Sequence, residues 1–145
     1  MTKYKELKTR QQKEIDAFPL GACFSNKQFE EMMAKWDLTV NDTDKICSVG
    51  GGCYIRKSDK DAFLEMFKRF EREKQDAIKE DRTGNGFIYD MFLYELANHE
   101  YCITNDLTDT LDAVDLSQEE INKDKRLSHG LNKAIKNYLK NVKEF

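Results

Sequence analysis

The segment from Tyr94 to Tyr101 holds the residues of this sequence that come closest to acid–base chemistry. His99 stands next to Glu100, and a histidine beside a carboxylate can act as a general acid–base pair near neutral pH. The other histidine, His129, lies far along the chain, and no obvious nucleophile accompanies His99. A histidine at a helix end also commonly bonds backbone carbonyls. The sequence therefore favours a protein that is not an enzyme, with a hydrolase centred on His99 and Glu100 as the weakest reading.

Four cysteines, at positions 23, 47, 53 and 102, raise the question of metal binding. Cys47, Cys53, His99 and Cys102 could supply four zinc ligands, but the paired short spacings of structural zinc sites are missing. Free cysteines are commonly buried as small apolar side chains. The sequence therefore predicts no metal and no cofactor. The polar N-terminus lacks a hydrophobic signal core and no apolar run could span a membrane, which predicts a cytoplasmic protein with reduced thiols.

Three consecutive glycines could in principle cradle a phosphate. Known phosphate loops place their glycines at the start of a helix, whereas here a strand-forming segment follows, so a hairpin turn is the better interpretation. A small-ligand or nucleotide-sensing domain nevertheless stays open as the alternative function. It would use the glycines with nearby basic residues and a histidine: Gly50, Gly51, Gly52, Arg56, Lys57 and His99.

The elements that must position these residues are organised around the stretch from Ile46 to Phe70. Strand-forming residues flank the glycines, and an amphipathic helix is predicted to start around Lys60. Apolar spacing and capping residues predict further helices. Leu20–Phe24 could be a short strand, and Tyr101–Thr104 could be another that joins the hairpin sheet. The expected fold is α+β, with five or six helices packed around a small antiparallel β-sheet centred on the glycine-tipped hairpin. At 145 residues and 39% hydrophobic content, we expect one globular domain over residues 1–145.

Charge is distributed unevenly along the chain, whose formal net charge is −3. No lysine or arginine occurs between Arg82 and Lys123, and the segment from Ile121 onward holds six lysines and one arginine against two acids. The simpler interpretation is that the basic last helix packs beside the acidic middle and neutralises it. The other is an exposed acidic face for a basic partner, formed by Glu100, Asp106, Asp109, Asp112 and Asp115. The acidic net charge disfavours direct binding to nucleic acid.

Three strings carry a resemblance to a known family: GGGCYIRKSDKDAF, YDMFLYELANHEYCIT and INKDKRLSHGLNKAIKNYLK. From Phe18 to Lys140 the chain resembles a family of small uncharacterised proteins carried on phages, plasmids and conjugative elements of gut Firmicutes. The resemblance implies a genomic setting in which small acidic proteins are often accessory factors, including inhibitors of host defence or restriction systems. The expected function is therefore a non-enzymatic protein-binding accessory protein of a mobile genetic element. Its expected partner is a protein with a basic surface, such as a nucleic-acid-binding host protein.

Overall fold

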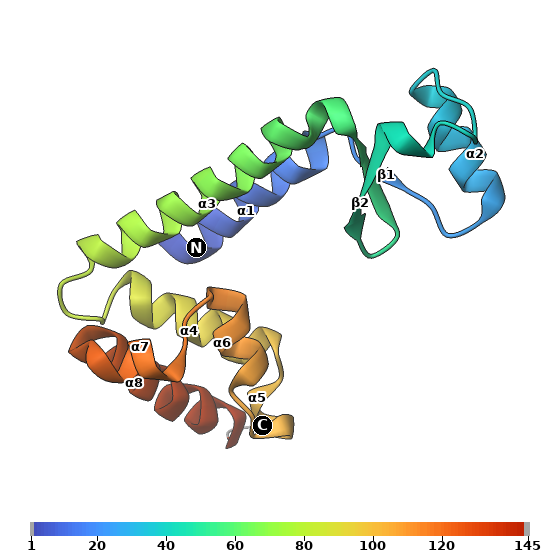
Figure 1. The fold of residues 1–145 in the computed structure, drawn as a ribbon. Coiled ribbons are helices and arrows are strands. Elements are labelled where there is room, and N and C mark those ends of the chain that lie inside the picture. The colour runs from blue at the N-terminus through green and yellow to red at the C-terminus, as the bar shows by residue number, and fades with distance from the viewer. Residues whose placement is uncertain (1, 144–145) are drawn as a thin grey trace. The chain divides into compact units, whose positions relative to one another are not determined.

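Helices dominate residues 2–143, the part of the chain that the computed structural model describes (Figure 1). The eight α-helices of these residues are α1 (Lys3–Ala17), α2 (Asn26–Lys35), α3 (Lys60–Glu80), α4 (Phe87–Asn98), α5 (Tyr101–Thr104), α6 (Thr108–Val114), α7 (Gln118–Lys123) and α8 (Lys125–Lys143). The strands of the same residues are β1 (Gly21–Ala22), β2 (Ile46–Gly50) and β3 (Cys53–Arg56). No helix of this part of the chain is long and apolar enough to cross a membrane.

The chain forms two compact units. Unit 2 is the continuous segment Gln11–Arg72, and unit 1 combines the residues up to Arg10 with those from Glu73 onward. The helices α1 and α3 each contribute one part to unit 1 and the other part to unit 2. The single domain over residues 1–145 stays a prediction.

Unit 2 contains the sheet, and its hairpin confirms the prediction made from the glycine triplet. The strands β2 and β3 pair antiparallel, β1 pairs with the other edge of β3, and the order is β1-β3-β2. The hairpin turn is tight because Gly50, Gly51 and Gly52 all adopt a positive φ, which glycine does at little cost. The expected strand within Leu20–Phe24 is also present, as β1.

The small core of unit 2 lies between α2 and the sheet. Met32, Met33 and Ile46 are buried there, with Trp36 and Tyr54 packed against them. The helix α2 begins where the capping residues predict, since the Ser25 hydroxyl accepts a hydrogen bond from the backbone N–H of Gln28 at 3.2 Å.

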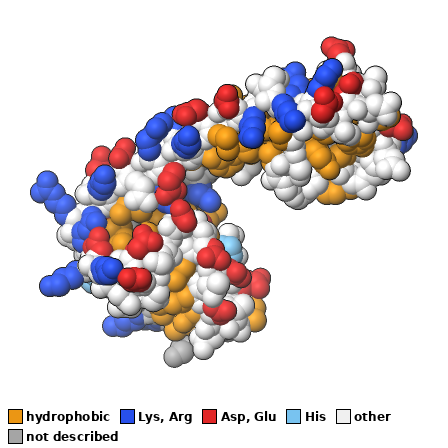
Figure 2. Space-filling model, viewed as in Figure 1, with side chains coloured by type: hydrophobic (Ala, Val, Ile, Leu, Met, Phe, Trp, Pro, Cys, Tyr) orange, Lys and Arg blue, Asp and Glu red, His pale blue; other side chains and the backbone are white. Residues whose placement is uncertain are grey.

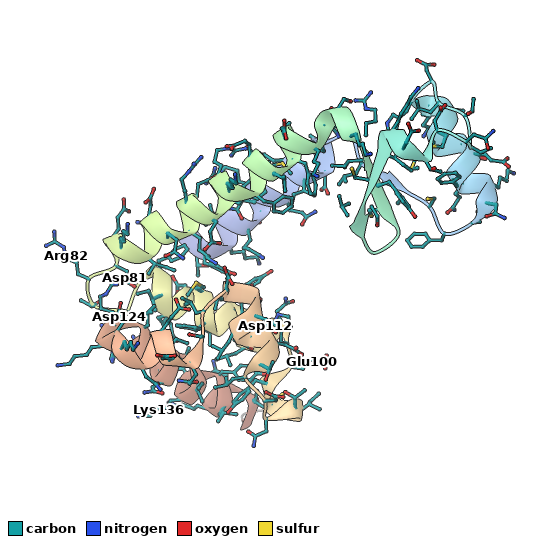
Figure 3. The ribbon with its side chains drawn as sticks, viewed as in Figure 1. Asp81, Arg82, Glu100, Asp112, Asp124 and Lys136 are labelled. Carbon is teal, nitrogen blue, oxygen red and sulfur yellow. The ribbon has the colours of Figure 1, made fainter. Side chains whose placement is uncertain are left out.

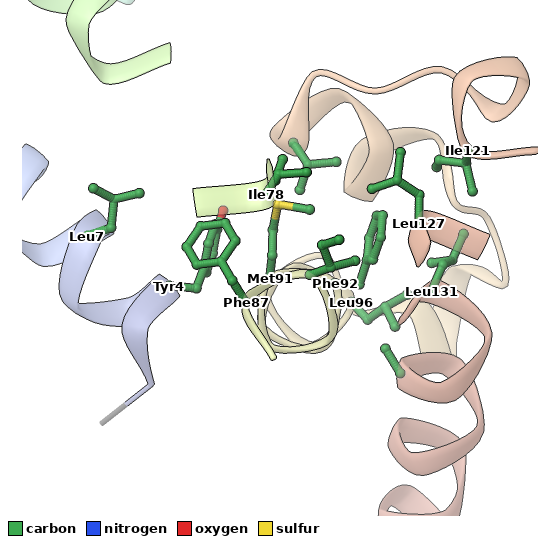
Figure 4. Close-up of a cluster of buried hydrophobic side chains, with 13 residues drawn as sticks. Tyr4, Leu7, Ile78, Phe87, Met91, Phe92, Leu96, Ile121, Leu127 and Leu131 are labelled. Carbon is green, nitrogen blue, oxygen red and sulfur yellow. The ribbon is translucent and has the colours of Figure 1, made fainter. Parts of the chain in front are cut away.

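Unit 1 is built around α4, which is apolar on most of its surface. Ile88, Met91, Phe92 and Leu96 are fully buried (Figure 4). Side chains from several other elements surround them: Tyr4 of α1, Ile78 of α3, Val114 of α6, Ile121 of α7, and Leu127, Leu131 and Ala134 of α8. Burying one large apolar side chain contributes about 1.5–3 kcal/mol. This all-helical cluster therefore supplies most of the hydrophobic stabilisation of unit 1.

The expected α+β fold, with five or six helices packed around a central sheet, is wrong. The described residues form eight helices, and the sheet belongs to unit 2 alone. The physical reason is size, because strands of two to five residues bury only Ile46 and Ile55, too little to hold the other helices. Tyr101–Thr104, expected as a strand of this sheet, is instead the helix α5 of unit 1.

The turn between α3 and α4 is organised by the carboxylate of Asp81. Its Oδ1 accepts hydrogen bonds from the backbone N–H groups of Thr83 (3.2 Å) and Gly84 (2.9 Å), and its Oδ2 accepts from those of Gly86 and Ile88 (both 3.0 Å). Burial alone would raise the pKa of Asp81, but these four hydrogen bonds outweigh it and lower the pKa below its ordinary value. The charged carboxylate thus fixes where α4 begins.

The same turn is held against the start of α8. The guanidinium of Arg126 donates to the backbone oxygens of Ile78 (2.9 Å) and Asp81 (2.8 Å), which lie at the C-terminal end of α3. Gly84 adopts a φ of +85°, and a Cβ atom on it would lie 2.2 Å from the carbonyl oxygen of Arg126. Two stretches of backbone therefore meet here without side chains between them.

Candidate functional site

Of the five acidic residues singled out from the sequence, Asp109 and Asp112 lie on α6 and the other three lie in the segments that flank α5 and α6; all five are exposed. We call them the acidic surface: Glu100, Asp106, Asp109, Asp112 and Asp115. Figure 3 shows Glu100 and Asp112 on one side of unit 1, with Lys136 of α8 on another. Asp109, Asp112 and Asp115 follow one another at three-residue spacing along α6 and its C-cap, and Glu100 and Asp106 belong to the same unit.

Three of these acids also shape the backbone. Glu100 and Asp115 adopt the left-handed conformation, with φ of 52° and 55°, where they end α4 and α6 respectively. Asp106 accepts hydrogen bonds from the backbone N–H (2.9 Å) and hydroxyl (2.7 Å) of Thr108 at the start of α6, which lower the pKa of its carboxyl group. Asp109 and Asp112 make no such contact in the described structure, so their side chains are available to a partner.

The basic C-terminal helix does not cover the acidic surface. Among residues 2–143, no ion pair joins the five acids to a lysine or arginine. Instead α8 packs mainly on α4 and α7. Arg126 pairs with Asp124 at 2.9 Å, and Lys133 lies 4.6 Å from the ring centroid of Tyr89. The ammonium of Lys74 donates to the backbone oxygen of Val114 at 2.6 Å, next to Asp115, but the five carboxylates form no ion pair with a lysine or arginine of the described residues.

A shallow groove of about 480 Å³ crosses this part of unit 1 between α6 and α7. Leu111 and Leu116 give it apolar walls, and the carboxylates of Asp112, Asp115 and Glu120 line it as well. An arginine or lysine side chain has the matching chemistry, because its aliphatic stem can pack on leucine while its charged head meets a carboxylate. Sequence reasoning found Asp112 and Asp115 and placed Leu111 on a short helix, but it did not predict the groove.

His99 contacts a different carboxylate from the one expected. Its Nε2 lies 3.2 Å from Oε2 of Glu95, one helical turn earlier in α4. The approach lacks hydrogen-bond geometry, so Nε2 has no hydrogen-bond partner despite its proximity to the carboxylate. Glu95 is only 1% exposed, and the Tyr4 hydroxyl donates to its Oε1 at 2.7 Å. A carboxylate enclosed in this way serves to hold the first turn of α1 against α4.

The tether between Tyr4 and Glu95 leads to a first prediction. Burial, and then the hydrogen bond to Glu95, raise the pKa of Tyr4, so the phenol stays protonated as the donor. Tyr4→Phe should lower the free energy of unfolding by about 1.5–3 kcal/mol, because a buried carboxylate loses its hydrogen bond. Chemical denaturation would measure this loss. If Tyr4→Phe lowers the free energy of unfolding by the same amount in a Glu95→Gln background as in the natural chain, the hydrogen bond to the Glu95 carboxylate does not account for the loss.

Within unit 2, the glycines and the basic residues of the ligand-sensing alternative lie at opposite ends of β3. Gly50–Gly52 form the hairpin turn at one end of β3, and Arg56 lies at the other end of that strand. Arg56 donates to Asp59 at 2.8 Å and its guanidinium carbon lies 5.9 Å from the ring centroid of Trp36. Lys57 is exposed in the 3-10 turn that follows, and His99 belongs to unit 1. The structure therefore brings Arg56 and Lys57 together as neighbours, but not with the glycines.

The cysteines are free thiols, and the four proposed zinc ligands are divided between the units. Cys47 and Cys53 lie in the hairpin, whereas His99 and Cys102 belong to unit 1. Within residues 2–143, no group of three or more histidine, cysteine or acidic side chains is arranged to hold a metal ion.

A groove of about 900 Å³ in unit 1 was not predicted from the sequence. It is lined by the first part of α1, the end of α3 and the start of α4, with Leu7, Ala77 and Phe87 among residues of both charge signs. One of these, Asp90, has its pKa raised by burial and then by the nearby charge of Asp81. The lining comes from segments far apart in the sequence, so local spacing could not reveal it.

The profile of one protein family matches residues 3–137, and its description is "Family of unknown function (DUF7659)". No curated protein and no solved structure matches the chain.

Proposed function

The chain belongs to the family of unknown function DUF7659, and from its own surface we propose that it is a non-enzymatic protein-binding module. In this proposal the acidic surface engages a basic surface of a partner protein. The observation that carries the proposal is the exposure of all five acids without an ion pair to lysine or arginine among the described residues.

Electrostatics supports this role. Like charges gathered on one exposed part of a protein steer the approach of an oppositely charged partner and set its orientation. Surface pairs each contribute little, about 0–1 kcal/mol, so affinity also requires apolar contact. The groove with Leu111 and Leu116 supplies apolar surface beside Asp112 and Asp115. An arginine or lysine side chain of the partner would occupy this groove as the anchor of the contact.

The proposal also covers the biological role of the protein as a product of a mobile genetic element. A chain of phages, plasmids or conjugative elements that presents an acidic surface could compete with nucleic acid for the basic surface of a host protein. Inhibition of a nucleic-acid-binding protein in a host defence or restriction system is the corresponding biological role. The resemblance to proteins of mobile elements of gut Firmicutes supports this part of the proposal.

The test is reversal of Asp109 and Asp112 to lysine, with Asp106 and the left-handed Glu100 and Asp115 kept because they shape the backbone. Tagged natural protein is used to capture partners from its host cells, and the double variant Asp109→Lys/Asp112→Lys is compared with it by quantitative mass spectrometry. We expect capture of the basic partner to fall at least tenfold, and to weaken with added salt.

The matched control is Glu30→Lys/Glu31→Lys, which makes the same change in net charge on the exposed part of α2. It should retain the partner, and circular dichroism should show the same helix content for all three proteins. Capture that is equal for both double variants, or a partner that carries no basic surface, would contradict the proposal.

A further inference from the structure

The helix α3 carries an apolar stripe at the surface of unit 2. Leu64 is 47% exposed and Phe67 is 41% exposed, one helical turn apart. Phe67 belongs to a row of aromatic rings in edge-to-face contact. In this row Phe18, Phe63, Phe67 and Phe70 follow one another at centroid distances of 4.9–5.5 Å. Figure 2 shows hydrophobic side chains at the surface of unit 2.

Within unit 2, α1 and α3 run antiparallel as a pair. The Arg69 guanidinium donates to Glu14 at 2.8 Å, the Gln11 side chain donates to the backbone oxygen of Phe70 at 3.4 Å, and Phe18 contacts Phe63. Two helices can bury only the sides that face each other. The stripe of Leu64 and Phe67 lies beside that contact, since almost half of each side chain remains exposed while Met66 and Phe70 are buried.

The charges around the stripe suit a second copy of the same helix. Lys60, Leu64, Phe67 and Glu71 follow one another at helical spacing on one side of α3. Leu64 and Phe67 are equally far from the midpoint between Glu65 and Met66, and so are Lys60 and Glu71. Two such helices packed antiparallel about that midpoint would therefore place Leu64 against Phe67 of the other copy. The same operation would place each Lys60 beside a Glu71.

We propose that α3 forms a symmetric dimer contact with α3 of a second copy of this chain, through the stripe of Lys60, Leu64, Phe67 and Glu71. Such a contact is self-complementary, as a twofold interface must be. The net charge of unit 2 is close to zero, with ten lysine and arginine residues against eleven acids from Gln11 to Arg72, so two copies would not repel each other strongly. Glu71 already has an interaction within its own chain, so the proposal uses the sign of its charge and not an absence of contacts.

The stripe is short, so the dimer should be weak, with a dissociation constant on the order of micromolar. Sedimentation equilibrium of the full chain should show the mass rising with concentration from 17.0 kDa toward twice that value. Phe67→Glu should weaken the dimer at least tenfold, because it places like charges at the centre of the contact. The control Ile103→Glu changes the 76% exposed Ile103 of α5 and should leave the dimer unchanged.

A charge exchange tests the antiparallel pairing itself. Lys60→Glu and Glu71→Lys should each weaken the dimer, and the double variant should restore it, because the pair across the axis is then reversed. A chain that stays at 17.0 kDa at all concentrations would overturn the proposal. The stripe would then be covered by another part of the same chain or by a different protein. A dimer unaffected by Phe67→Glu, or a double variant weaker than both single variants, would overturn it as well.

Discussion

Gly84→Ala is expected to lower the free energy of unfolding of unit 1 by about 2–5 kcal/mol, since two independent costs add at this position. The φ of +85° disfavours any residue with a Cβ atom. The added methyl group would also lie 2.2 Å from the carbonyl oxygen of Arg126, and backbone cannot move aside as a flexible side chain can. Urea denaturation followed by circular dichroism would measure the change.

The control for Gly84→Ala is Gly51→Ala in the hairpin turn. Gly51 also has a positive φ, of +60°, but no atom lies within 4 Å of the position its Cβ would take. Alanine there should cost about 1–2 kcal/mol from backbone strain alone. The difference between the two variants reports the contact between the turn and α8. Equal losses would mean that Arg126 moves aside freely and that the close approach is unimportant.

Asp81→Asn is expected to cost about 2–3 kcal/mol at neutral pH. An asparagine keeps one acceptor oxygen and its amide group cannot accept, so two of the four backbone N–H groups that now donate to Asp81 lose their acceptor. The variant should also lose the charge that faces the N-terminal turn of α4, where a helix favours a negative group. Unfolding at pH 7 would measure the change.

The pH dependence of stability gives Asp81 a second test. Its pKa is lower in the folded chain than in the unfolded one, so the stabilisation is complete above the ordinary carboxyl pKa and is lost as the pH falls through the folded value. The natural chain should therefore lose stability below about pH 4, whereas Asp81→Asn should lose less over the same range. Identical acid profiles for the two proteins would show that the carboxylate does not need its charge.

Local signals in the sequence identified the elements better than their arrangement. The glycine triplet predicted the hairpin, and Ser25 and Ser117 predicted two helix starts, because caps and turns depend on residues within a few positions. The centre of the fold was misplaced because the hairpin is distinctive in sequence but buries little. The apolar surface of α4, from Phe87 to Asn98, was the better indication of a central helix.

The candidate site divides in the same way. The absence of lysine and arginine between Arg82 and Lys123 was visible in the sequence and located the acidic surface. The burial of Glu95 was not visible there. That carboxylate lies in a polar-looking run, and its hydroxyl donor, Tyr4, is 91 positions earlier in the chain. The leucine-lined groove was missed for a related reason, since Leu111 and Leu116 read simply as core residues until α6 and α7 are placed side by side.

Unit 1 is formed by two separate stretches of the chain, and this affects how it folds during synthesis. Its first residues emerge before Gln11–Arg72, and the remainder of the unit emerges only afterwards. The first turn of α1 therefore stays without its buried partners until α4 has been synthesised. A nascent chain interrupted near residue 72 would expose the apolar side chains of Tyr4 and Leu7, and chaperones bind exposed apolar side chains.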